Sequence, residues 1–114
     1  MNMSHYLVVI TTASAKKEAT EIVQCLLKER LIACANIIGP ISSHFWWKDQ
    51  IDEATEFLVV MKSSRKLFDE LSKRVKEIHS YKVPEIIALP ILKGSPSYLS
   101  WLEANLRSES DDDG

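Results

Sequence analysis

The chain has 114 residues, a length that fits one domain built around a single apolar core. Hydrophobic residues make up 46% and charged residues 26%, an ordinary globular composition that excludes an intrinsically disordered chain. The net charge of −2, with lysines and arginines interleaved with acids, argues against a nucleic-acid partner.

The first residues show no charged leader, long apolar stretch or small-residue cleavage site. We therefore expect a cytoplasmic protein whose two cysteines, Cys25 and Cys34, are reduced thiols. The longest apolar runs are far shorter than the roughly 18 residues that a membrane span needs, so we predict no membrane partner.

In chain order, the first two elements are a strand and a helix. Residues 6–10 form a short β-branched run, typical of a central strand buried on both faces. Ser14 can cap a helix over residues 15–29, in which apolar residues recur at three- and four-residue spacing.

Residues 32–62 predict a long β-hairpin. Residues 32–47 read as extended chain, and Gly39 and Pro40 indicate a bulge or kink within it. A polar turn at Asp49 and Gln50 then leads into the return strand over residues 51–62.

A second helix follows the hairpin. Ser63 or Ser64 can cap it, its apolar stripe faces a core, and it should end near His79. Residues 86–89 then predict a short strand, which the flanking prolines place either at the sheet edge or in a position with interrupted pairing.

The last element is a C-terminal helix, with Ser95 as its cap and Pro96 at its first position. Residues 1–107 thus form one domain, and residues 108–114 read as an acidic, disordered tail because they cannot bury apolar surface.

This order predicts the α+β class: a ferredoxin-like βαββαβ antiparallel sheet with an extra C-terminal helix. Two helices cover one face of the sheet and leave the other bare. That face, and a hairpin that ends in Trp46 and Trp47, expose more apolar surface than a monomer usually tolerates. We therefore expect a homo-oligomer with cyclic symmetry.

Five segments closely resemble the CutA family of divalent-cation tolerance proteins. In chain order they are RLIACANI at 30–37, SHFWW at 43–47, KS at 62–63, HSYKVPE at 79–85 and YLSW at 98–101. The resemblance implies a homotrimer whose hairpins wrap neighbouring subunits, and a link to tolerance of copper and other divalent ions. The sequence departs from the family at Ser80, where proline is common, and at Thr11, where some members carry a thiol.

Several residues are candidates for a binding site. His79 lies at a helix end, beside Tyr81 and Glu85, where it can bind a metal ion or be held by a carboxylate. The alternative is a histidine that only interacts favourably with the helix dipole. Lys62 can pair with Glu85 across a subunit boundary. The predicted ligand site comprises Lys62, His79, Tyr81, Glu85 and Trp47, and the predicted metal ligands are His79 and Cys34. The alternative for Cys34 is a buried small hydrophobe.

The resemblance thus implies a trimeric binding or scaffold protein linked to tolerance of divalent ions, which requires no cofactor and has copper or another divalent ion as the possible ligand. The alternative is a small-molecule sensor like the trimeric PII proteins, with ligands in the clefts between subunits. An enzyme is disfavoured because the sequence holds no Gly-rich phosphate loop and no Ser-His-Asp or Cys-His constellation at a recognisable turn.

Overall fold

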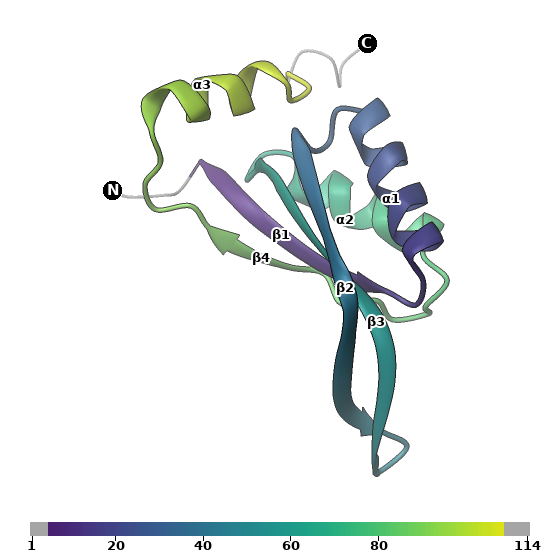
Figure 1. Cartoon of the computed structure of the whole chain (residues 1–114). Helices are drawn as coiled ribbons and strands as arrows, with labels where there is room; N and C mark the ends of the chain where they lie inside the picture. Colours follow the sequence, from purple (N-terminus) through teal and green to yellow (C-terminus); the bar gives the residue numbers. More distant parts are fainter. Residues whose placement is uncertain (1–4, 109–114) are drawn as a thin grey trace.

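The computed structural model describes residues 5–108, so the predicted tail beyond Ser108 lies outside the described residues. The elements in chain order are β1 (Tyr6–Ala13), α1 (Lys16–Lys28), β2 (Cys34–Trp47), β3 (Gln50–Ser64), α2 (Phe68–Ile78), β4 (Ile87–Pro90) and α3 (Pro96–Ala104). The strands form one antiparallel sheet in the order β2-β3-β1-β4, with the β2–β3 hairpin projecting beyond it (Figure 1). The α+β class and the order of elements are confirmed.

Helix α1 begins one residue later than predicted. Its N-cap is Ala15, and the Ser14 hydroxyl donates instead to Glu18 Oε1 at 3.1 Å. The helix ends in a paired backbone motif, in which Leu31 N–H donates to Leu26 O while Arg30 N–H donates to Leu27 O. Arg30 adopts the left-handed conformation, with φ 56°, that this ending requires.

The long hairpin is confirmed, with its turn one residue earlier than predicted. Lys48 and Asp49, not Asp49 and Gln50, form a two-residue turn in which both φ angles are positive, as in type I′ hairpins. The pairing register shifts between Ile38 and Ile41, which confirms the predicted irregularity around Gly39 and Pro40.

The predicted caps of the second helix are wrong because β3 continues through them. Ser64 pairs with Tyr6 in the sheet, and the N-cap of α2 is Leu67. The Ser63 hydroxyl is buried and donates to Leu31 O at 2.6 Å, so it fastens the chain after α1 to the sheet.

The C-terminal elements agree with the prediction. Within residues 5–108, strand β4 lies at the edge of the sheet and pairs with β1 alone, and it lies one residue later than predicted, over Ile87–Pro90. Ser95 caps α3, because its hydroxyl accepts from Tyr98 N–H at 3.3 Å, and Pro96 is the first helical residue.

The two faces of the sheet differ sharply. Alternate residues of β1 and β3 point toward α1 and α2 and form the core, among them Val9, Val59 and Met61. The intervening residues form an uncovered apolar surface, here called the open face. It comprises Val8, Ile10, Ile38, Leu58, Val60, Ile87 and Leu89.

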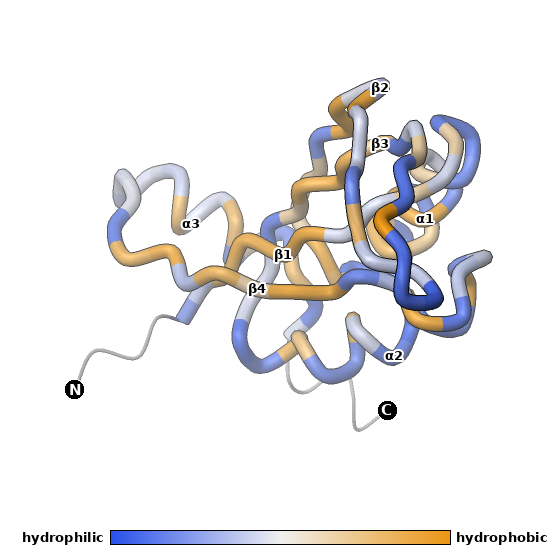
Figure 2. Tube along the Cα trace, turned by 90° about the horizontal axis from the view of Figure 1, so that it is seen from below, coloured by the Kyte–Doolittle hydropathy of each residue, from blue (hydrophilic) through white to orange (hydrophobic). Residues whose placement is uncertain are grey.

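Residues of the open face are exposed where β4 lies: Ile87 is 49% and Leu89 51% exposed. Figure 2 shows the apolar chain of β4 and β1 running side by side, whereas α2 alternates between polar and apolar residues. No helix within residues 5–108 is long and apolar enough to cross a membrane.

The core within residues 5–108 contains a buried hydroxyl without a hydrogen-bond partner. Thr11 is fully buried, and its hydroxyl has no hydrogen-bond partner among the residues of the described range. Leaving a buried hydroxyl unpaired costs about 1–3 kcal/mol.

We expect Thr11→Val to raise the free energy of unfolding by about 1–2 kcal/mol, as measured by chemical denaturation. The exposed Thr20→Val on α1 is the matched control and should change little; a loss of stability in Thr11→Val would contradict the assignment.

Candidate functional site

A cavity of about 780 Å³ lies between the projecting hairpin and the loop that follows α2. Its wall combines three aromatic side chains with three carboxylates: Phe45, Trp47 and Tyr81 with Asp52, Glu56 and Glu85. This cavity, here called the hairpin pocket, brings together three of the five predicted ligand residues, namely Trp47, Tyr81 and Glu85.

The hairpin register places three of the pocket residues on one face. Phe45 is paired with Asp52, and Trp47 lies two residues further along β2, so all three side chains point the same way. Thr12, at the end of the open-face row of β1, lines the pocket floor. The hairpin pocket therefore adjoins the open face.

Tyr81 is joined to the buried Glu56 by a short hydrogen bond. The phenol donates to Glu56 Oε2 at 2.6 Å. Burial, and then the bond to Glu56, raise the pKa of Tyr81 to about 12. The phenol therefore keeps its proton at neutral pH and ties the loop to the base of β3.

His79 lies behind Tyr81, with a side chain that is 0% exposed. Its Nε2 is 2.6 Å from Thr12 O, and its Nδ1 accepts from Tyr81 N–H at 3.0 Å. A carbonyl oxygen can only accept, so Nε2 must carry the proton and the imidazole is held in one neutral tautomer. A metal ion could bind either nitrogen only after one of these bonds broke.

Glu18 on α1 completes this junction. Its Oε2 accepts from Ser80 N–H at 2.7 Å and lies 3.6 Å from His79 Nδ1. Burial raises the pKa of Glu18, but hydrogen bonds from Ser80 and Ser14 outweigh it and lower the pKa below its ordinary value. We call His79, Glu18, Tyr81 and Glu56 the polar junction, because they fix the loop after α2 against three other elements.

The remaining predicted residues lie elsewhere. In the sheet, Lys62 pairs with Val8 of β1 on one side and with Cys34 of β2 on the other. Val8 lies four residues, or about 13 Å, from Thr12 along β1. Cys34 Sγ lies 3.4 Å from the hydroxyl of Tyr98 on α3. That bond, and then burial, raise the pKa of Tyr98. Pairing of Lys62 with Glu85 across a subunit boundary stays a prediction.

The two predicted metal ligands are not brought together within one chain. His79 contacts Thr12 at one end of β1, whereas Cys34 lies level with Val8. Across residues 5–108, no group of three or more histidines, cysteines or carboxylates is placed to hold a metal ion. Copper binding at these residues therefore stays a prediction.

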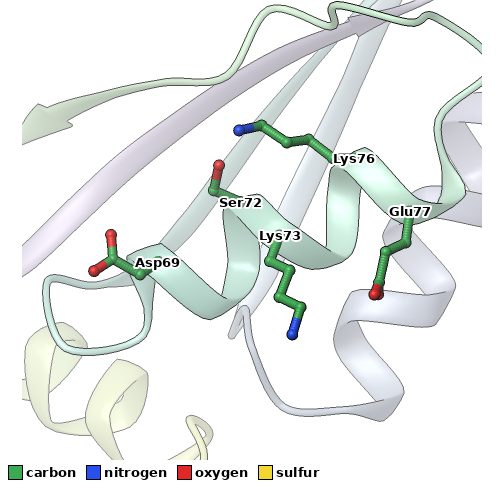
Figure 3. A pocket seen from close by; sticks show the side chains of 5 residues that line it. All are labelled: Asp69, Ser72, Lys73, Lys76 and Glu77. Carbon is green, nitrogen blue, oxygen red and sulfur yellow. The ribbon is translucent and has the colours of Figure 1, made fainter.

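A second hollow, of about 510 Å³, lies on the outer surface of α2 (Figure 3). Its lining residues all belong to this one helix and point to different sides of it: Asp69, Ser72, Lys73, Lys76 and Glu77. Mixed charges at helical spacing are typical of a solvated helix face, so we assign it no binding role.

Sequence reasoning missed four residues that shape the site: Glu56, Asp52, Thr12 and Glu18. Glu56 gave the clearest signal, since it stands at the start of the apolar run of β3 and is nevertheless buried. A buried carboxylate requires a partner, but no sequence pattern identifies that partner as Tyr81, 25 residues away.

The tautomer of His79 can be tested directly. Long-range ¹H–¹⁵N NMR spectra should show a protonated Nε2 and an unprotonated Nδ1, because Nε2 donates to the Thr12 carbonyl. The exposed His5 and His44 provide internal references. A protonated Nδ1 beside a bare Nε2 would contradict this geometry.

The bond between Tyr81 and Glu56 predicts a pH dependence at alkaline pH. Because folding raises the pKa of Tyr81 from near 10 to about 12, its contribution to stability is complete below pH 10 and is lost as pH rises through 12. Tyr81→Phe should remove this part of the pH dependence of the unfolding free energy. Identical profiles for the two proteins between pH 9 and 12 would refute the assignment.

Comparison with known proteins identifies close relatives. The model of the CutA1 divalent ion tolerance protein family matches residues 7–105. The divalent-cation tolerance protein CutA of Thermus thermophilus is 41% identical over 98 residues, which is 86% of this chain and 95% of the relative. Its counterpart in Archaeoglobus fulgidus is 42% identical over 92 residues, covering 81% of this chain and 89% of that protein.

The fold agrees with that of a solved structure from the same family. The crystal structure of CutA1 from Oryza sativa superposes with a TM-score of 0.90 at 35% identity, covering 96% of this chain and 100% of that one. Because the family match spans both the sheet and the polar junction, the resemblance read from the sequence is confirmed. The chain belongs to the CutA1 divalent ion tolerance protein family.

Proposed function

We propose that this protein acts as a homotrimer in the tolerance of divalent ions, copper among them, and that it works in the cytoplasm as a binding or scaffold protein rather than an enzyme. Family membership supports the link to divalent ions. The resemblance implies the trimer, and the open face independently supports self-association.

The open face is the observation that carries this proposal. Its seven apolar residues extend across all four strands, on the side opposite α1 and α2. The hairpin tip adds Trp46, which is 73% exposed, and Ile51, which is 71% exposed. Exposed apolar surface of this extent marks an interaction site, and another copy of the same chain is the commonest partner.

Two side chains with basic or nucleophilic character, His79 and Cys25, favour a non-catalytic role. Both ring nitrogens of His79 are engaged by backbone groups. Burial, and then the hydrogen bond to Glu29, raise the pKa of Cys25, which leaves less of the reactive thiolate. Neither residue is therefore poised as a base or a nucleophile.

A second candidate is a small-molecule sensor, for which the hairpin pocket is the specific support. The pocket combines apolar walls with a few polar groups, as ligand sites commonly do. Trp47, Tyr81 and Glu85, predicted as ligand residues from the sequence, all line it.

Assembly can be tested at the open face. Leu89 is half exposed on β4, so Leu89→Lys should leave the chain folded but place a charge in the proposed interface. We expect light scattering at micromolar concentration to give the mass of a trimer for the natural chain and a smaller mass for Leu89→Lys. Circular dichroism of the two proteins should agree.

Thr20→Lys, which adds the same charge on the exposed side of α1, is the control and should remain a trimer. In a host strain without its own CutA-family protein, the natural chain should support growth in copper and Leu89→Lys should not. A folded Leu89→Lys variant that keeps the trimer mass would refute the interface.

A further inference from the structure

The hairpin pocket has the chemistry of a cation site. Asp52, Glu56 and Glu85 place three carboxylates around one cavity, against one lysine in its lining, Lys82, and a second, Lys48, beside the Trp47 ring. His44 also lines the pocket, but its Nδ1 lies 3.5 Å from Glu53, which can balance its charge if it is protonated. The wall therefore carries an excess of negative charge, which disfavours a phosphate or nucleotide.

The buried carboxylate of Glu56 is the innermost of the three. Glu56 is 8% exposed, and Tyr81 donates a hydrogen bond to its Oε2 only. The other oxygen, Oε1, receives no donor from the residues that the structure describes. It is thus available to a cation that enters the pocket.

The aromatic side chains add a second type of recognition. The faces of Trp and Tyr rings attract cations, most strongly in a partly desolvated pocket. The chain already shows this contact, because Lys48 Nζ lies 6.0 Å from the centre of the Trp47 ring. A bare metal ion would not use the rings, and no cluster of three metal ligands is found within residues 5–108.

We propose that the hairpin pocket binds an organic cation, an ammonium group attached to a small apolar body. Its charge is balanced by the carboxylates of Glu85, Asp52 and Glu56. Its alkyl groups contact the rings of Trp47 and Tyr81, whose faces also attract the positive charge. This inference rests on the proposed small-molecule site and names the class of its ligand.

Two probes of nearly equal size separate charge from shape. Tetramethylammonium carries the charge, whereas tert-butanol is neutral. In an NMR titration that follows the indole N–H of Trp47, we expect tetramethylammonium to bind at least about tenfold more tightly than tert-butanol. The difference should shrink at high salt, because ion pairs are screened.

Single neutral substitutions then locate the site. Glu85→Gln and Asp52→Asn lie on exposed positions and should each weaken binding of tetramethylammonium about threefold or more while the fold is kept. Glu21→Gln, on the exposed side of α1 and outside the pocket, is the matched control and should bind as the natural chain does.

Three results would overturn the inference. Equal affinity for the two probes would show that charge is not recognised, and unchanged binding in Glu85→Gln and Asp52→Asn would place the cation elsewhere. Binding of ATP in place of tetramethylammonium, weakened by Lys82→Gln, would keep the small-molecule site but reject the cationic class. The trimer mass does not depend on any of these results, so failure here is distinct from failure of the assembly.

Discussion

The arrangement of the molecule depends on one constraint: the sheet has two apolar faces, and the chain covers only one of them. Alternation along β1 sends Val9 toward the helices and Val8 and Ile10 to the opposite side. Helices α1 and α2 bury the first set. The second set remains as the open face, whose transfer out of water favours association by roughly 25 cal/mol per Å² of apolar area.

The polar junction determines where the open face ends. His79 and Glu18 hold the loop after α2 against β1 and α1, and Tyr81 ties the same loop to Glu56 on β3. These bonds span 25 to 67 residues of sequence, so they form only when the sheet and both helices are in place. Tyr81 and Glu56 of this junction also line the hairpin pocket, together with Thr12 at the end of the open-face row of β1. A partner seated on the open face would therefore lie beside the pocket, which connects assembly with ligand binding.

The sequence predicted those features that depend on local patterns. The alternation of polar and apolar residues predicted the hairpin, and the prolines that flank residues 86–89 indicated an edge strand or one with interrupted pairing. Ser95 followed by Pro96 predicted the start of α3. The start of α2 was wrong because Ser63 looks like a cap in sequence, whereas its hydroxyl bonds Leu31, 32 residues earlier. The predicted site residues fall in two separate places, because their positions also depend on contacts between residues far apart in the sequence. Trp47, Tyr81 and Glu85 meet in one pocket, but Lys62 and Cys34 lie at the other end of β1, and only the strand register reveals this.

Sedimentation equilibrium of the natural chain, over a dilution series through the micromolar range, shows whether the open face requires a partner. We expect a mass three times the 13.0 kDa of one chain at every concentration, because the open face is too apolar to remain in water. A well-folded species of 13.0 kDa would contradict it, since the open face would then be stable without a partner.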